Sequence, residues 1–190
     1  MATGGLDASE TLVAGVGHIY VADVGTTAPT DLAEPGSGWH DLGYTTEDGA
    51  TFSYSPSVEN LNAWQSFYPI RRIITEIEAQ VSFTLLQIQD PEAFVFAFGG
   101  GAEEETGVES GVFQYTPAAP GTLDERAMLL DVIDGDVMQR FVVPRGLQAG
   151  NVEAQFVRTD MANLPIEFGV LGTGDADPWY SLRGDVPNGE

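Results

Sequence analysis

The sequence IITEIEAQVSFTLLQIQ (residues 73–89), followed directly by DPEAFVFAFG (residues 90–99), decides the fold of this chain. Its first part alternates between apolar and polar residues. Because successive side chains of a strand point to opposite faces, this pattern predicts one long strand with a buried face and a wet face. The buried face would carry Ile77, Ala79, Val81, Phe83 and Leu85, and the wet face would carry Glu76, Glu78, Gln80, Ser82 and Thr84.

The signals of a helix begin at Asp90. Asp90 is a favourable N-cap, Pro91 suits the first helical position, and Glu92 lies in the first turn, where the helix dipole favours an anion. Gly99 can provide a left-handed C-cap. The sequence therefore predicts a short helix directly after the long strand.

Short alternating segments separated by turn signals fill most of the remaining chain, and no second domain boundary is visible. We therefore expect one domain over residues 1–190: a mainly β, antiparallel sandwich or barrel with one flanking α-helix. Turns are expected at Asp48-Gly49 and Asp134-Gly135. The expected strands cover residues 18–24, 39–46, 51–55, 111–116, 126–133, 137–143, 151–159 and 164–171.

The two ends of the chain and one acidic run look irregular. We expect an N-terminal arm at about residues 1–15 and a C-terminal tail at about residues 172–190, with Trp179 and Tyr180 as its anchors. The run of Glu103, Glu104, Glu105 and Glu109 is expected to be a solvated loop.

The charge of the chain is strongly one-sided. It has 29 acidic residues and seven basic ones, all of them arginine, for a net charge of −22. A nucleic-acid binder needs a basic footprint, so this composition argues against a broad DNA-binding surface and against anionic membrane surfaces. Either solubility in a salty medium (or an arginine-favouring genome) or a surface that must repel a polyanion would explain it. We expect neither a signal peptide nor membrane insertion, because the first twelve residues are polar and no long apolar run exists.

Residues 55–72, SPSVENLNAWQSFYPIRR, combine aromatic rings with arginine. Protein interfaces favour both residue types. We therefore expect an extended interaction loop at about residues 50–72, although the rings could instead cover the core of their own domain. The predicted interface residues are Trp64, Phe67, Tyr68, Arg71 and Arg72.

Residues capable of catalysis or metal binding form no convincing set. His18 and His40 lie in expected strands without a serine nucleophile nearby. The acidic segment 131–136 lacks the ligand spacing of a calcium loop, and Glu76 and Glu78 are a pair expected by chance in so acidic a chain. We expect no enzymatic activity, no cofactor and no metal.

Five segments together resemble a known family. They are WHDLGYTTEDGATFSYS (39–55), VENLNAWQS (58–66), PIRR (69–72), FTLLQ (83–87) and FAFGG (96–100). This set resembles the major tail tube proteins of long non-contractile-tailed phages, especially those of actinobacteria. The resemblance covers about residues 19–100, and the later strands match only in style.

The resemblance implies a structural virion protein of the phage tail, present in the host cytoplasm during assembly. Its subunits would form hexameric rings whose inner sheets join into one β-barrel, and the rings would stack into a tube through an extended loop and the chain termini. DNA would pass through an acidic lumen without specific binding. Implied partners are the tape measure, tail terminator and distal tail proteins.

Combined with this resemblance, the wet face of the long strand acquires a predicted role. Residues Glu76, Glu78, Gln80, Ser82 and Thr84 would line the lumen, where an acidic wall without lysine would not retain DNA. A different class of function stays open: a β-sandwich binding module, either carbohydrate-binding or capsid-decorating, whose exposed aromatics would stack on a ligand.

Overall fold

The computed structural model describes residue 5 and residues 11–105, 111–174 and 176–187. Within these residues the chain is mainly β, and every strand pair is antiparallel. The elements are β1 (Val16–Asp23), β2 (His40–Asp41), β3 (Thr45–Leu61), β4 (Arg71–Leu85), α1 (Pro91–Ala97), β5 (Gly101–Glu105), β6 (Phe113–Pro117), β7 (Glu125–Asp134), β8 (Val137–Gln148), β9 (Leu164–Val170) and β10 (Tyr180–Asp185).

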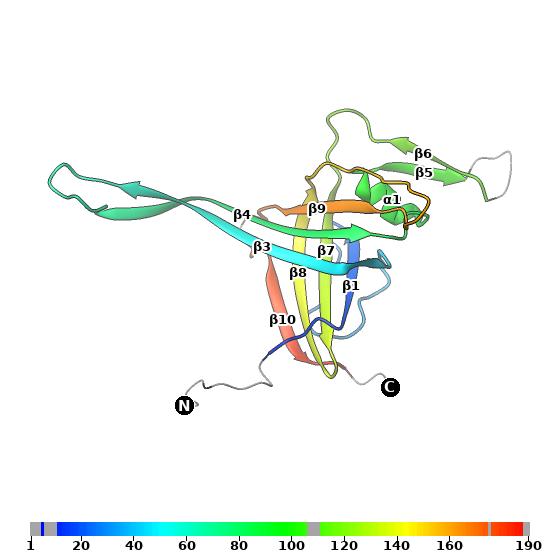
Figure 1. The fold of residues 1–190 in the computed structure, drawn as a ribbon, viewed down its shortest axis with the longest axis horizontal. Coiled ribbons are helices and arrows are strands. Elements are labelled where there is room, and N and C mark those ends of the chain that lie inside the picture. The colour runs from blue at the N-terminus through cyan, green and yellow to red at the C-terminus, as the bar shows by residue number, and fades with distance from the viewer. Residues whose placement is uncertain (1–4, 6–10, 106–110, 175, 188–190) are drawn as a thin grey trace.

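Strand β8 divides the main sheet into two layers. The strand order is β2-β1-β7-β8-β9-β4-β3, and β10 also pairs with β8. The first part of β8, residues 137–142, pairs with β10, while residues 146–148 pair with β9. In Figure 1 the layer of β1, β7, β8 and β10 runs steeply across the layer of β9, β4 and β3, as in orthogonal sheet packing.

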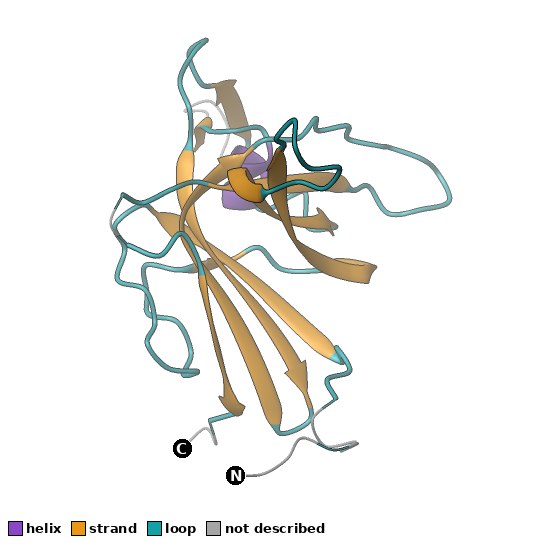
Figure 2. Ribbon diagram, turned by 90° about the vertical axis from the view of Figure 1, so that its left-hand side faces the viewer, coloured by secondary structure: helices purple, strands orange, loops and turns teal. Residues whose placement is uncertain are grey.

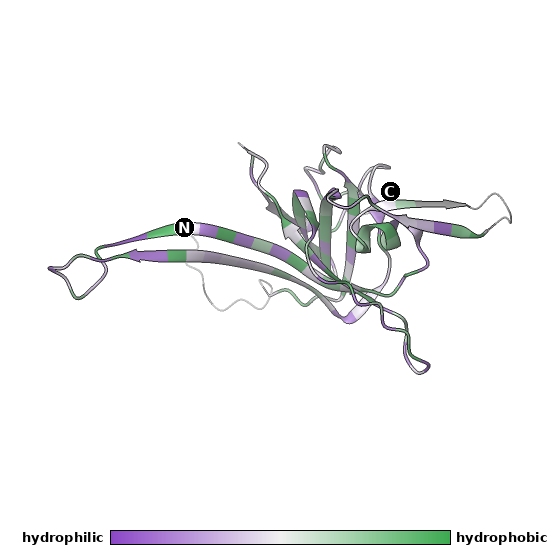
Figure 3. Ribbon diagram, turned by 90° about the horizontal axis from the view of Figure 1, so that it is seen from above, coloured by the Kyte–Doolittle hydropathy of each residue, from purple (hydrophilic) through white to green (hydrophobic). Residues whose placement is uncertain are grey.

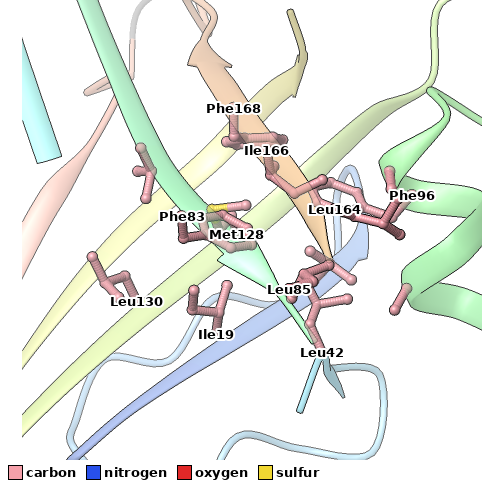
Figure 4. Packing of buried hydrophobic residues seen from close by; sticks show 14 of the residues in the cluster. Ile19, Leu42, Phe83, Leu85, Phe96, Met128, Leu130, Leu164, Ile166 and Phe168 are labelled. Carbon is pink, nitrogen blue, oxygen red and sulfur yellow. The ribbon is translucent and has the colours of Figure 1, made fainter. Parts of the chain in front are cut away.

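The core fills the space between these layers and is closed at one end by α1 (Figures 2 and 4). Three strands contribute side chains that are fully or almost fully buried: Met128 of β7, Phe83 and Leu85 of β4, and Phe168 of β9. Phe96 of α1 packs against Phe168, with the two rings tilted and their centroids 5.8 Å apart. Full burial of one such side chain contributes about 1.5–3 kcal/mol. The helix is therefore held by its apolar side chains.

The predicted long strand and helix are both confirmed, with shifted ends. On the predicted buried face of the strand, residues 79–85 are buried as expected, but Ile77 is 51% exposed because it lies beyond the body. Strand β4 begins at Arg71 and ends at Leu85, and a turn follows in which Asp90 donates a backbone hydrogen bond to Gln87. Asp90 is the N-cap of α1, and its carboxylate accepts a hydrogen bond of 2.9 Å from the backbone of Ala93. Gly99 follows the helix with φ 72°.

Strand β3 corrects the prediction of two short strands with a turn at Asp48-Gly49. From the pair Thr45–Leu85 to the pair Ala50–Phe83, β3 advances five residues while β4 advances two. The extra residues form a bulge in which Gly49 has φ 67°, a conformation that favours glycine. The Asp-Gly signal thus marks a bulge inside one long strand, and the preceding expected strand shrinks to β2.

Three further expectations need correction. Residues 151–159 form no strand, and only an isolated bridge joins Gln155 to Asn163; β9 pairs instead with β4 along most of its length and with the end of β8 at residues 168–170. The acidic run is not a loop throughout, because Glu103–Glu105 belong to β5, which pairs with β6; Glu109 lies outside the described residues. The C-terminal tail contains β10.

The two predicted tail anchors are confirmed. The ring of Trp179 lies 4.7 Å from that of Phe52, and the Tyr180 hydroxyl donates a hydrogen bond to the carbonyl of Pro29. Most of the predicted N-terminal arm lies outside the described residues. Its last residue, Gly15, donates a backbone hydrogen bond of 3.0 Å to Ile133.

Candidate assembly surfaces

Strands β3 and β4 continue beyond the body of the molecule as a two-stranded arm (Figures 1 and 3). Strand β4 pairs with β9 only from Gln80 onward, so residues 71–79 lie beyond β9. Gln80 also pairs with Ser53 of β3. We define the arm as residues 54–79 and its tip as residues 62–70. Isolated two-stranded ribbons are marginally stable in water, so a long projecting arm is typical of a segment that another chain covers.

The aromatic residues predicted at an interface lie together at the tip. Trp64, Phe67 and Tyr68 are 98%, 106% and 81% exposed. The tip is closed by its own hydrogen bonds: Ile70 donates to the carbonyl of Leu61, and the Ser66 hydroxyl donates to the carbonyl of Tyr68. The alternative that these rings cover the core of their own domain is therefore wrong.

The predicted loop is also more regular than expected. Residues 50–61 lie in β3, and Arg71 and Arg72 begin β4, so only the tip is irregular. Arg72 donates a hydrogen bond of 3.0 Å to the side-chain oxygen of Asn60 across the ribbon. Among the described residues, no carboxylate lies within salt-bridge distance of Arg71 or Arg72.

Three other arginines form salt bridges within the body, and one of these pairs is buried. Arg140 and Asp131 are both buried and form two hydrogen bonds of 2.7 Å each. Although burial opposes the charged form, this bond to Asp131 raises the pKa of Arg140. Arg126 contacts Asp23, Glu92 and Asp124, and Arg145 contacts Glu125. Arg71 and Arg72, which adjoin the tip, thus have no carboxylate partner among the described residues, whereas these three arginines stabilise the fold.

One face of the proximal arm and of the adjoining part of β4 is polar, from Thr51 to Ser57 on β3 and from Glu76 to Ser82 on β4. The cross-strand pairs on this face are Thr51–Ser82, Ser53–Gln80, Ser55–Glu78 and Ser57–Glu76. Glu76, Glu78 and Gln80 are exposed, and Ser82 and Thr84 are half-buried. The residues predicted to line a lumen therefore share one hydroxyl- and carboxylate-bearing face outside the subunit core.

Comparison with known proteins yields matches over almost the whole chain. A family model described as "Phage tail tube protein" matches residues 4–189. The chain belongs to the phage tail tube protein family. It is also 27% identical over 189 residues to the major tail protein Gp23 of Mycobacterium phage D29, covering 92% of this chain and 91% of that protein. The same protein of Mycobacterium phage L5 is 27% identical over 191 residues, covering 93% and 92%.

This tail tube protein is a structural component of the phage virion tail, and its resemblance to actinobacteriophage proteins is confirmed. The alternative of a carbohydrate-binding or decorating module is not favoured by these matches. Within the described residues, no helix has the length and apolarity needed to cross a membrane.

Both histidines of this tail tube protein and Asp131 have structural partners. His18 lies 3.0 Å from a carboxylate oxygen of Asp41, and His40 lies 3.1 Å from the N-cap Asp90. Asp131, the first residue of the weak calcium-loop pattern, forms a salt bridge with Arg140. No group of three or more potential metal ligands occurs among the described residues.

Two surfaces of this tail tube protein were not predicted from the sequence. The β5–β6 hairpin projects from the body on the side opposite to the arm (Figure 3). The other face of the arm carries exposed apolar residues on both strands. The alternation of Phe52, Tyr54 and Val58 in the sequence could have extended the predicted strand to include them.

Proposed function

We propose that this tail tube subunit assembles into hexameric rings that stack into a tube, and that the tube conducts DNA during ejection. The observation that carries this proposal is the arm: a long ribbon with one polar face, one apolar face and an aromatic, arginine-bearing tip. A sheet extension of this kind has no function in an isolated subunit. It becomes useful when neighbouring copies cover it.

The open edges of the arm support a shared barrel. Among the described residues, β3 pairs only with β4, and residues 71–79 of β4 pair only with β3. Unpaired backbone N–H and C=O groups on such edges favour addition of further strands. In the proposed ring, strands of adjacent copies close these edges, and the inner sheets form one continuous barrel.

The polar face then becomes the lumen wall, with Glu76, Glu78, Gln80, Ser82 and Thr84 exposed to the channel. Its composition suits a conduit for DNA, because carboxylates repel phosphates and the four cross-strand pairs from Thr51–Ser82 to Ser57–Glu76 include no lysine or arginine that can hold them. The role is structural and non-enzymatic. Five residues in or next to the tip contact a neighbouring subunit: Trp64, Phe67, Tyr68, Arg71 and Arg72. The tape measure, tail terminator and distal tail proteins bind the ends of the tube.

Thiol labelling of assembled particles tests the lumen assignment directly. The chain has no cysteine, so Glu78→Cys places one thiol on the polar face. A small maleimide should modify this thiol in the tube, whereas a maleimide on a large polymer should react only after the tube is dissociated. Equal reaction of the large reagent with intact tubes would place Glu78 on the outside.

Negative-stain microscopy tests assembly itself. Purified protein and lysates of expressing cells should contain six-fold rings or tubes. A chain that stays monomeric at every concentration, with no particles in any lysate, would contradict the proposed function.

A further inference from the structure

The arm contains a second irregularity, close to its middle. Ser57 pairs with Glu76, but the next residue, Val58, pairs with Ile74, so Thr75 is an extra residue in β4. Without it, strict alternation would put Ile73 on the same face as Ile77. The bulge exchanges these positions, so that Ile74 joins the face of Ile77 and Ile73 moves to the polar face.

This change of phase keeps one face of the arm apolar. Strand β3 contributes Val58 to that face, opposite Ile74. Val58, Ile74 and Ile77 are 51%, 61% and 51% exposed, and we call these three residues the apolar stripe. The stripe continues the side of the sheet that is buried in the body, where Val81 and Phe83 are in the core.

The subunit's own cover ends where the stripe begins. Trp179 packs against Phe52 with ring centroids 4.7 Å apart, and its ring centroid lies 6.3 Å from that of Tyr54 in a T-shaped arrangement. Beyond Tyr54, the stripe residues remain half exposed or more. A contiguous apolar face of this kind marks a protein contact.

Charge identifies the partner. Residues 58–74 contain two arginines and one glutamate, a net charge of +1. The other 173 residues contain five arginines and 28 acidic residues, a net charge of −23. The distal arm thus fits an acidic protein surface, and the rest of this same chain provides one. A net charge of +1 is too small a footprint for DNA.

We infer that the apolar stripe docks on the body of a second copy of this chain, with Arg72, which shares the face of the stripe, pairing with acidic residues of that copy. The inference rests on the proposed function and adds to it the face of the arm that is buried, leaving the polar face free for the lumen. Because an arm meets a body, the contact joins different surfaces and repeats from copy to copy, as an open-ended assembly requires.

Adjacent isoleucines provide a matched test. Ile74→Ser removes an apolar side chain from the stripe, and Ile73→Ser makes the same change on the opposite face, one residue away. We expect Ile74→Ser to raise the concentration needed for tube formation by about tenfold or more, as for a buried interface residue. Ile73→Ser should assemble like the unmodified chain. Tube yield is measured by sedimentation and microscopy of the purified protein alone, and circular dichroism checks that both variants remain folded.

The outcomes separate the two proposals. If the unmodified chain forms no particles, the proposed function fails and the inference fails with it. If it forms tubes and Ile74→Ser does so equally well, or if both variants lose assembly equally, only the inference is overturned. Tubes formed from purified protein also exclude a different tail protein or DNA as the required occupant of the stripe.

Discussion

At the scale of single residues, the fold depends on the buried salt bridge between Arg140 and Asp131. Arg140 also donates hydrogen bonds to the carbonyls of Asp31 and Ala33, so it attaches the loop between β1 and β2 to the sheet. Each charge is acceptable in the interior only because the other is present.

Arg140→Leu should therefore destabilise the fold strongly, because it leaves the Asp131 carboxylate buried without a counter-ion. We expect a loss of about 3–5 kcal/mol in the free energy of unfolding, measured by urea denaturation. The matched control is Arg145→Leu, whose partner Glu125 is partly exposed, and it should cost about 1 kcal/mol or less. Equal losses for the two variants would contradict this explanation.

At the scale of elements, α1 and the arm show how a short segment depends on a few contacts. The helix has only seven residues, too few for stability on its own, so its N-cap and its buried side chains decide whether it forms. The arm depends even more on what lies outside it, because its tip contacts little of its own chain.

Asp90→Ala should weaken the helix by removing the acceptor for the Ala93 amide and the partner of His40. The expected loss is about 0.5–2 kcal/mol in the free energy of unfolding. Asp90→Asn retains an oxygen that can cap the helix and should recover most of the stability. Failure of the asparagine variant to recover stability would show that the carboxylate contact with His40 dominates instead.

Trp64→Ala should block tube formation while leaving the subunit folded. Its ring is 98% exposed, so truncation removes almost no contact within the subunit but would remove a large aromatic anchor between subunits. Thermal denaturation should show an unchanged melting temperature, and microscopy should show few or no tubes. A normal tube yield from this variant would remove Trp64 from the interface.

At the scale of the whole molecule, the sequence predicted what local pattern determines. Alternation in β4 and the cap at Asp90 need only neighbouring residues, and both predictions are confirmed. The single long β3 was missed because Gly49 serves a bulge as readily as a turn. Strand β10 was missed because its pairing with β8 is a long-range contact, which the Gly- and Asp-rich sequence around it does not reveal.

The same limit applies to the candidate surfaces. The interface at the aromatic tip was predicted from composition alone, because protein interfaces favour clustered aromatic residues and arginines. The part of the apolar stripe that β4 contributes could not be predicted in full, because the extra residue at Thr75 exchanges the faces of Ile73 and Ile74, and strict alternation does not detect an extra residue.

The shared strand β8 has a mechanical consequence. In the main sheet, the backbone link between the arm-bearing layer and the other layer is the short β8–β9 pairing. It has three register pairs, Gly146–Val170, Leu147–Gly169 and Gln148–Phe168, and a flanking backbone hydrogen bond at each end, from Leu171 to Arg145 and from Ala149 to Glu167. At this crossing a side chain on Gly146 would collide with the ring of Phe168, so the strands meet too closely for any larger residue. A pull on the arm is therefore passed to the other layer through a narrow joint and through the apolar side chains around it. We expect a tail built from such subunits to flex at this joint, one small tilt per copy, while each layer stays rigid.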